Sequence, residues 1–327
     1  MAGWGSRLRP HTLTIPKPMV KIAGKPIVQR LVENLSQSVS EKIDEINFII
    51  RKEFGKATEE KLMQVAKEMG TKGIISYQES PEGTAHAIYC AKESLKGNVI
   101  VAFADTLFKT DFTIDTSKDG VVWVNKIDDP SAFGVVKLNN NNEITDFVEK
   151  PKDFVSNLAI IGIYYFKSGE NLKTEIEYLL DNDIRDKGEY QLTNALENLK
   201  QKGAIFVPGE VEEWLDCGNK DACVYTNQRV LEINKSFEKF SFSNNLKNSI
   251  IIEPCFIGKN VEIHNSIIGP HVSIGENTII NDSIIKNTII QENTKISGRV
   301  IEGSMIGNKV ILTNKKEDLS IGDYSTS

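Results

Sequence analysis

Residues 250–310 read IIIEPCFIGKNVEIHNSIIGPHVSIGENTIINDSIIKNTIIQENTKISGRVIEGSMIGNKV, and aliphatic residues return in this stretch every five or six positions. Glycine, asparagine and serine fill the intervals between them. A repeat this short has room for one strand and a corner, not for a pair of helices. The stretch therefore predicts a short left-handed parallel β-helix of the hexapeptide type, with about three coils. The predicted inward side chains are Ile257, Ile263, Ile268, Ile274, Ile280, Ile285, Ile290, Ile296, Ile301 and Ile306.

Upstream of the repeats, strand-like and helix-like segments alternate as far as about residue 235. EINFII (45–50) and NVIVAFAD (98–105) are apolar enough for buried strands, whereas KPIVQRLVENLSQSV (25–39) has the apolar spacing of a helix. Such alternation predicts an α/β domain with a mostly parallel, Rossmann-like sheet and helices on both faces. Ligands of such a sheet bind at the carboxyl ends of its strands.

The composition is that of a soluble globular protein, and it limits the partners. The net charge of −6 argues against nucleic acid. The longest apolar run, LAIIGIYYF (158–166), is far shorter than the roughly 20 residues of a membrane helix, and no signal peptide is visible. We therefore expect a cytoplasmic protein with reduced cysteines and no membrane partner. The cysteines, none of which forms a CxxC pair, are Cys90, Cys217, Cys223 and Cys255.

The segment MAGWGSRLRPHTLTIPKPM (1–19) has the features of a phosphate-binding loop. Its glycines allow a ligand to approach the backbone, and free N–H groups can hold phosphate oxygens. Arg7 and Lys17 add a guanidinium fork and a point charge, which suit a triphosphate. The loop is not a Walker A motif, because no Lys-Ser/Thr pair follows the glycines, nor a dinucleotide fingerprint, because Leu8 replaces the third glycine.

This segment belongs to a longer stretch, GWGSRLRPHTLTIPKPMVKIAGKPIV (3–28), that resembles the signature G-x-G-[ST]-R-L-x-P-x-T-x(4)-K-P of the sugar-1-phosphate nucleotidylyltransferases. This family includes glucose-1-phosphate thymidylyltransferases and mannose-1-phosphate guanylyltransferases, which make nucleotide-sugars. Many members also carry a C-terminal hexapeptide-repeat β-helix. The resemblance continues in order through residue 218, in QESPEGTAHA (78–87), VAFADTLF (101–108), DFVEKP (146–151) and EEWLDCG (212–218).

The resemblance implies roles for the matching residues. Lys17 would contact the α-phosphate, Arg7 would steady the departing pyrophosphate, and Lys150 would hold the sugar phosphate. Asp105 and Asp216 would converge on Mg²⁺, a hard cation that prefers carboxylate oxygens. The implied nucleotide-binding residues are Gly3, Gly5, Ser6, Gln78, Gly83 and Thr84. The implied sugar-binding residues are Gly134, Glu149, Asn157 and Gly162.

The resemblance also implies a division of the chain and a set of partners. We expect a nucleotidylyltransferase catalytic domain over 1–240, the β-helix over 246–312 and a tail over 313–327. The expected partners are a nucleoside triphosphate, a sugar 1-phosphate and a second copy of the chain in a homo-oligomer. In the family, an apolar strand precedes the glycine loop, whereas this sequence begins inside the loop. We therefore expect the codons upstream of Met1 to encode about five to eight further residues, mostly Ile, Val or Ala.

The base and the sugar stay open. Gln78, with the backbone of Gly83, favours the imide edge of a pyrimidine, hence dTTP or UTP. GTP with mannose 1-phosphate is the alternative within the class. A bifunctional uridylyl- and acetyltransferase is a second alternative, although the short β-helix has no obvious catalytic histidine on an inserted loop. A third is a non-catalytic regulatory paralogue.

Overall fold

The computed structural model describes residues 3, 5–109, 114–234 and 245–314. The chain divides into two compact units, one made of 1–20 and 25–222 and the other of 21–24 and 223–327. The domain boundaries expected from the sequence stay a prediction, and the tail lies outside the described residues from 315 onward. None of the helices in the described ranges is long and apolar enough to cross a membrane.

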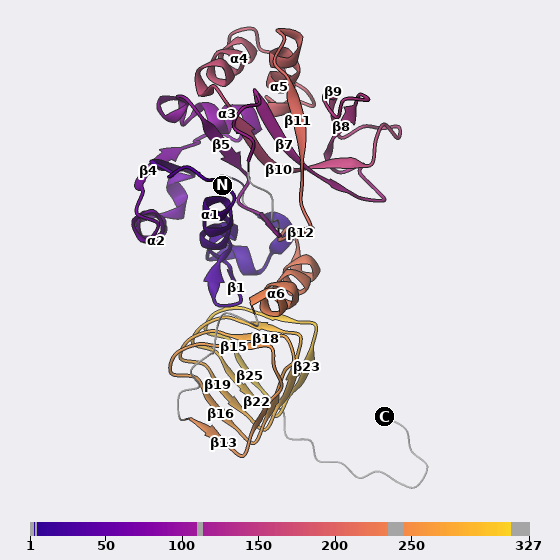
Figure 1. The fold of residues 1–327 in the computed structure, drawn as a ribbon. Coiled ribbons are helices and arrows are strands. Elements are labelled where there is room, and N and C mark those ends of the chain that lie inside the picture. Colours follow the sequence, from indigo (N-terminus) through magenta and orange to yellow (C-terminus); the bar gives the residue numbers. More distant parts are fainter. Residues whose placement is uncertain (1–2, 4, 110–113, 235–244, 315–327) are drawn as a thin grey trace. The chain divides into compact units, whose positions relative to one another are not determined.

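The first unit contains a six-stranded sheet with β10 at its centre (Figure 1). β10 pairs antiparallel with β5, β7 and β8, β8 pairs antiparallel with β9, and only β11 runs parallel to its neighbour β7. The α/β class is confirmed, but this sheet is mixed rather than mostly parallel. The strands are β5 Val99–Ala102, β7 Gly120–Lys126, β8 Gly134–Leu138, β9 Ile144–Glu149, β10 Leu158–Phe166 and β11 Phe206–Glu210.

The physical reason for the mixed pairing lies in the connections. Parallel neighbours need a long crossover, usually a helix, whereas antiparallel neighbours can be joined by a short turn. No helix lies between β7 and β10 in the sequence, so β8 and β9 return directly on one another. The sequence contained this signal, since four strand-like segments follow one another there without a helical segment between them.

Helices α3, α4 and α5 pack side by side against this sheet (Figure 1). In α5, Leu192, Ala195, Leu196 and Leu199 recur at helical spacing and are all buried, so one face of the helix joins the core. The helices of this unit are α1 Ile27–Gln37, α2 Lys56–Glu68, α3 Thr84–Tyr89, α4 Gly169–Asp181 and α5 Leu192–Gln201, with the 3₁₀ turns η1 Ser6–Leu8, η2 His11–Leu13, η3 Lys17–Met19, η4 Lys52–Phe54 and η5 Lys92–Ser94.

A second, two-stranded parallel sheet joins β3 (Glu45–Ile50) to β4 (Lys72–Tyr77), and α1 and α2 contribute to its core. Between β3 and β5 lies a cavity of about 590 Å³, whose lining is largely apolar and includes Leu31, Phe48 and Val101. Within the described ranges, no strand pairs with the edges of β3 and β5 that face this cavity. The remaining strands before the repeats are β1 Lys21–Ile22, β2 Lys25–Pro26, β6 Thr106–Lys109 and β12 Glu213–Asp216.

The second unit contains the predicted parallel β-helix, built from three parallel sheets, together with most of helix α6 (Lys220–Asn234) (Figure 1). Strands β13–β24 make four coils and β25 begins a fifth, so the expectation of about three coils was too low. The count missed the first two strands of the first coil, where Leu246 and Ile251 are only partly buried. The strands are β13 Leu246–Lys247, β14 Ile250–Ile251, β15 Cys255–Ile257, β16 Glu262–His264, β17 Ile267–Ile268, β18 Val272–Ile274, β19 Ile279–Asn281, β20 Ile284–Lys286, β21 Ile289–Ile290, β22 Lys295–Ser297, β23 Val300–Glu302, β24 Met305–Ile306 and β25 Ile311–Thr313.

Asparagines at the corners connect neighbouring coils. Asn tolerates the left-handed backbone conformation that a sharp corner requires, and Asn260, Asn265 and Asn277 have φ of 56°, 50° and 57°. Their side chains bond along the stack: Asn260 Nδ2 donates to Asn277 Oδ1 at 3.1 Å, and Asn265 Nδ2 donates to Asp282 Oδ1 at 3.1 Å. The corner residues therefore supply both the turn and a coil-to-coil hydrogen bond.

Candidate active site

The glycine loop folds over Lys17. Gly5 has φ +63°, and a Cβ added there would lie 2.9 Å from the Lys17 Cβ atom, so this position needs glycine. Thr12 Oγ1 donates to the Gly5 carbonyl oxygen at 2.8 Å, and Leu8 is fully buried beneath the loop. The loop is thus anchored from below, while Ser6 and Arg7 stay exposed.

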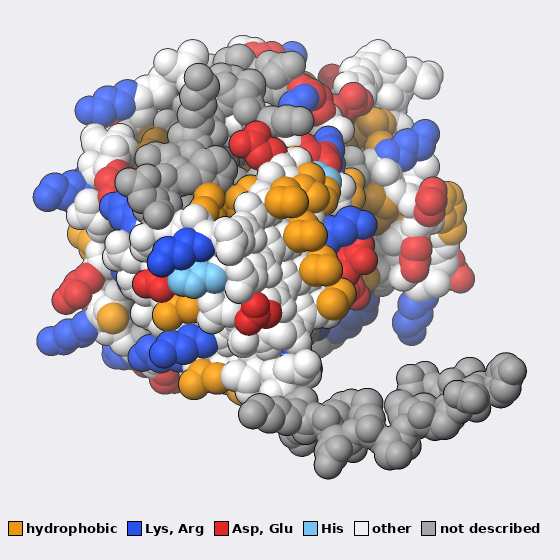
Figure 2. Space-filling view, turned by 90° about the horizontal axis from the view of Figure 1, so that it is seen from below, with side chains coloured by type: hydrophobic (Ala, Val, Ile, Leu, Met, Phe, Trp, Pro, Cys, Tyr) orange, Lys and Arg blue, Asp and Glu red, His pale blue; other side chains and the backbone are white. Residues whose placement is uncertain are grey.

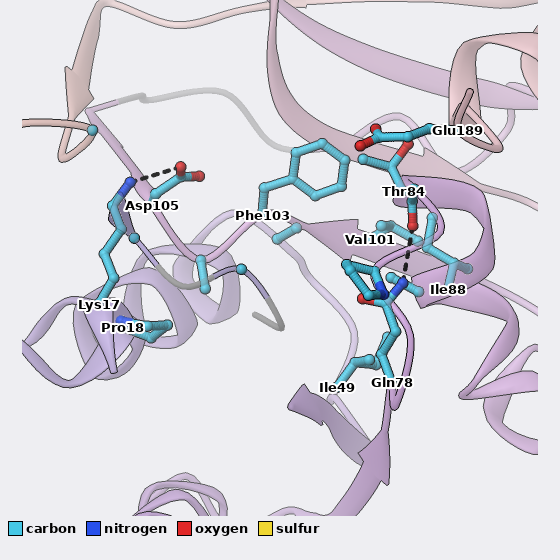
Figure 3. Close-up of a pocket in the computed structure, with 18 of the residues that line it drawn as sticks. Lys17, Pro18, Ile49, Gln78, Thr84, Ile88, Val101, Phe103, Asp105 and Glu189 are labelled. Carbon is cyan, nitrogen blue, oxygen red and sulfur yellow. Dashed lines mark hydrogen bonds and ion pairs between the residues drawn. The ribbon is translucent and has the colours of Figure 1, made fainter. Parts of the chain in front are cut away.

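A cavity of about 460 Å³ opens beside this loop (Figure 3). It lies at the carboxyl end of β5, where the sequence predicted a ligand. Its lining contains nine of the residues predicted for nucleotide, phosphate or metal binding: Gly3, Gly5, Ser6, Arg7, Lys17, Gln78, Gly83, Thr84 and Asp105. The structure therefore brings segments 3–17, 78–84 and 105 to one site in the first unit.

Lys17 and Asp105 form the charged end of this cavity. The Lys17 Nζ atom lies 2.8 Å from Asp105 Oδ2, and the two side chains point toward one another (Figure 3). Lys17 is 7% exposed, so water screens its charge poorly. Arg7 also lines the cavity and has no ion-pair partner among the described residues. This end of the cavity is suited to an anion with several negative charges.

Asp216 lies next to Asp105 because β12 pairs antiparallel with β6. The Cys217 backbone N–H donates to the Asp105 carbonyl oxygen at 2.9 Å. Burial raises the pKa of the Asp216 carboxyl; a hydrogen bond from the Gly218 backbone opposes this shift, and the Asp105 carboxylate adds to it. A Cβ at Gly218 would lie 2.7 Å from Asp216 Oδ2, so glycine leaves room for this carboxylate.

This donor set fits Mg²⁺. Two adjacent carboxylates, both partly buried, raise each other's energy when both are charged, and a cation between them relieves that repulsion. Nowhere in the described ranges do three or more His, Cys, Asp or Glu side chains converge. Asp105 and Asp216 would therefore leave the other coordination positions to phosphate and water oxygens, as Mg²⁺ prefers.

Gln78 and Thr84 lie at the opposite end of the cavity (Figure 3), and Gly83 also lines the cavity. Gln78 Nε2 donates to the Gly83 carbonyl oxygen at 3.1 Å. A Cβ at Gly83 (φ +111°) would lie 2.4 Å from the Tyr190 carbonyl oxygen, so only glycine fits. The Thr84 hydroxyl accepts from the Leu192 backbone N–H at 2.9 Å and so joins α3 to the start of α5.

The residues predicted for the sugar and its phosphate do not line this cavity. Gly134 and Glu149 are opposite one another on β8 and β9, and Glu149 Oε2 accepts from Thr193 Oγ1 at 3.5 Å. Lys150 has φ +44°, and its Nζ atom lies 3.4 Å from Glu149 Oε1. Asn157 makes a backbone hydrogen bond to the neighbouring segment: its carbonyl oxygen accepts from the Ile127 N–H at 3.0 Å.

Gly162 connects this group to the cavity. It has φ +85°, and a Cβ there would lie 2.8 Å from Phe103 Cδ2. Phe103 lines the cavity, and its backbone N–H donates to the Gly162 carbonyl oxygen at 2.8 Å. Gly162 therefore shapes the wall of the cavity through the ring of Phe103.

The model of the nucleotidyl transferase family matches residues 1–233. The chain belongs to this family. Among curated nucleotidyl transferase relatives, the bifunctional protein GlmU of Methanococcus vannielii is 32% identical over 332 residues, covering 90% of this chain and 73% of that protein. A glucose-1-phosphate thymidylyltransferase of Streptomyces antibioticus is 29% identical over 335 residues, covering 95% and 91%. A solved UDP-glucose pyrophosphorylase with bound UDP-glucose superposes with a TM-score of 0.59 at 23% identity, covering 71% of this chain and 96% of that one, and so supports the fold.

Four of the residues that sequence reasoning missed lie at or beside this nucleotidyl transferase site. Phe103, Glu189 and Gly218 line the cavity, and His86 lies 3.2 Å from Gln78. Three of them fall inside segments that the resemblance already marked, at 78–87, 101–108 and 212–218. The charged and polar neighbours in those segments already accounted for the expected chemistry. Gly218, Phe103 and His86 were therefore not predicted separately.

Proposed function

We propose that this nucleotidyl transferase joins a nucleoside monophosphate from UTP or dTTP to a hexose 1-phosphate and releases pyrophosphate. The observation that carries the proposal is the cavity itself. One end combines Arg7, Lys17 and Asp105, with Asp216 next to Asp105, and the other end is lined by the Gln78 amide and the Gly83 backbone. The name of the thymidylyltransferase relative agrees with this reaction class.

The reaction needs no general base. An oxygen of the sugar 1-phosphate is already ionised at neutral pH, and it attacks the α-phosphorus while the bond to the β-phosphate oxygen breaks. Negative charge builds on the α-phosphoryl oxygens and on the departing pyrophosphate. Lys17 is buried in surroundings of low dielectric constant and offsets the charge at the α-phosphate. Arg7 stabilises the pyrophosphate.

Asp105 and Asp216 are the proposed Mg²⁺ ligands. When bound, the metal neutralises phosphate charge and orients the triphosphate. Asp105 has a second role, because its ion pair with Lys17 at 2.8 Å keeps the ammonium at the edge of the cavity before substrate arrives. Lys150, next to Glu149 on β9, is the proposed ligand of the sugar phosphate, with Gly134, Asn157 and Gly162 near the sugar.

The base-binding end favours uracil and thymine. The Gly83 backbone N–H has no acceptor among the described residues, and the Gln78 side-chain oxygen accepts from none of them. Together they offer one donor and one acceptor. The imide edge of uracil or thymine presents the complementary pair, a carbonyl oxygen and an N–H. Guanine presents the same order on a larger ring, which keeps GTP with mannose 1-phosphate as the competing substrate pair.

The test is pyrophosphate release from the purified chain over a panel of triphosphates (dTTP, UTP, GTP, ATP, CTP), each with glucose, mannose and N-acetylglucosamine 1-phosphates and Mg²⁺. We expect turnover with dTTP or UTP and much less with CTP and ATP. Turnover confined to GTP would replace the proposed nucleotide, and release from none of the pairs would favour a regulatory paralogue.

Two proposals concern the surroundings of the enzyme. We propose a cytoplasmic location, which the free thiols of the four cysteines support. We also propose a homo-oligomer. Figure 2 shows exposed hydrophobic side chains in a row beside largely uncharged surface. In the β-helix, an exposed apolar residue stands in register on each of four adjacent strands, Ile250, Ile267, Ile284 and Val300. A monomer mass in light scattering at micromolar concentration would contradict the oligomer.

A further inference from the structure

The base-binding residue Gln78 is held by a second side chain, that of His86. Gln78 is 5% exposed, and its Nε2 atom lies 3.1 Å from the Gly83 carbonyl oxygen and 3.2 Å from His86 Nδ1. An amide nitrogen carries two hydrogens and no lone pair for accepting. Both hydrogens are therefore engaged, one by each partner, and the amide oxygen is the atom left for a ligand.

The contact with Gln78 fixes the state of the histidine ring. Since an amide N–H₂ group donates, His86 Nδ1 must be the acceptor, and the ring proton is then on Nε2. Glu82 favours this tautomer, because its Oε1 atom lies 3.9 Å from His86 Nε2. Arg185 in turn holds Glu82, with NH2 at 3.1 Å from Glu82 Oε2.

Segment 82–86, which carries Glu82 and His86, is also held by Tyr190. The Arg185 guanidinium lies 4.0 Å from the centre of the Tyr190 ring and bonds the Tyr190 hydroxyl at 2.8 Å. The Tyr190 backbone pairs with segment 82–85, accepting from Ala85 N–H at 2.9 Å and donating to the Glu82 carbonyl at 2.8 Å. His86 therefore belongs to a network with little freedom to rearrange.

We propose that His86 is a positioning residue that locks the orientation of the Gln78 amide, so that its oxygen faces the base and the site selects an imide over an amidine-type edge. The inference rests on the proposed function, whose nucleotide it specifies. Uracil and thymine carry N–H at position 3, which the amide oxygen accepts. Cytosine carries a bare nitrogen at that position and an amino group beside it, so it would place acceptor against acceptor and donor against the Gly83 N–H.

Without the lock, the amide can turn over by rotation about its last side-chain bond. The Gly83 carbonyl still opposes that rotation, so loss of His86 removes part of the preference and leaves part of it. One neutral hydrogen bond changes an equilibrium by about three- to tenfold. The effect should fall on discrimination between bases, since His86 does not line the cavity and does not touch the phosphate end.

The experiment compares His86→Leu with His86→Asn. Leucine fills the space of the ring without an acceptor, whereas the Asn oxygen stands on the same bond path from Cβ as Nδ1 did. Dissociation constants for UTP and CTP, and for dTTP and dCTP, are measured by calorimetry with Mg²⁺, and kcat and KM by pyrophosphate release. We expect His86→Leu to lower the UTP-to-CTP preference about three- to tenfold, with KM for UTP raised and kcat at saturation unchanged. His86→Asn should keep most of the preference.

An unchanged preference in His86→Leu would overturn the lock, as would an equal loss of affinity for both nucleotides, which indicates a structural role. Equal binding of UTP and CTP by the wild-type chain would also overturn it, because the amide would then not be oriented. That result leaves the proposed function standing if the wild-type chain still releases pyrophosphate. Absence of turnover, together with a wild-type preference for UTP that His86→Leu lowers, would instead reject the proposed function and support the lock.

Discussion

The two units use their apolar residues in different ways. In the β-helix, Ile263, Ile280 and Ile296 repeat one inward position on three stacked strands. Each strand pairs with its counterpart one coil later, so every contact is close in the sequence. In the first unit, β6 pairs with β12, although strands β7 to β11 lie between them in the sequence, and Thr106 is opposite Asp216. The repeat unit is built from neighbours, the first unit from distant segments.

This difference explains where the chemistry lies. A stack of equivalent coils gains stability from each interface between neighbours, but it repeats one environment at every level. A reactive site needs unlike groups at one place, which only segments far apart in the sequence can supply. Gly5, Lys17, Gln78 and Asp105 meet at the end of β5, and their polar groups are only partly satisfied by one another.

The largest expected effect is a loss of turnover when the two carboxylates of the first unit are replaced. Replacing Asp105 or Asp216 by Asn should lower turnover by about a hundredfold or more, because charge stabilisation at the phosphates is lost. The matched control is Asp282→Asn in the β-helix, whose contact with Asn265 an amide oxygen can keep. Steady-state pyrophosphate release and circular dichroism measure the two outcomes. Near-normal turnover in Asp105→Asn and Asp216→Asn would reject these residues as metal ligands. It would also weaken the conclusion that the chemistry lies in the first unit.

The next effect concerns the cavity between β3 and β5. Five to eight residues of Ile, Val and Ala fused in front of Met1 should enter this cavity as a strand, since the lining residue Ile49 is shared with the cavity at Gly3. Buried aliphatic side chains stabilise by roughly 1.5–3 kcal/mol each before the entropy of ordering. At roughly 2–4 °C per kcal/mol, we expect Tm to rise by about 10 °C. Calorimetry measures it.

The control for that extension is a fusion of equal length made of Ser and Gly, which should leave Tm nearly unchanged. The apolar fusion should also raise turnover, because the glycine loop would continue from a paired strand. Equal Tm values for the two fusions would show that the cavity does not accept a strand.

A smaller effect separates inward from outward positions within one coil. Ile285 is fully buried and Ile284, its neighbour on β20, is 49% exposed. Ile285→Ala should lower the free energy of unfolding of the β-helix by about 2–5 kcal/mol. Ile284→Ala should change it by about 0.5 kcal/mol or less. Urea unfolding followed by circular dichroism measures both. Similar losses at the two positions would contradict the assignment of inward and outward faces, unless light scattering places Ile284 in an interface between copies.

The same contrast decides how much could be predicted from the sequence. The inward Ile residues of the β-helix were predicted one by one, because a period of five or six residues reports burial directly. In the first unit, the loop at Gly5 and the strand end at Asp105 were predicted from local patterns. The antiparallel pairing of β10 and the network of His86, Glu82 and Arg185 were not, because each depends on which distant segments become neighbours.

The last prediction has an expected effect of zero and tests whether the β-helix is catalytically silent. Some relatives are named bifunctional, and an acetyltransferase in the second unit is an alternative that the sequence left open. The described coils pass from strand to strand through short corners with no inserted loop. His271, a candidate base, faces Glu232 of α6, with Nε2 at 2.9 Å from Glu232 Oε1. His264 sits at the end of the short strand β16. We therefore expect no transfer of labelled acetyl from acetyl-CoA to glucosamine or galactosamine phosphates, measured beside a functioning acetyltransferase as positive control. Labelled product that disappears in His271→Ala would make the repeat unit a second enzyme and reverse the contrast between the units.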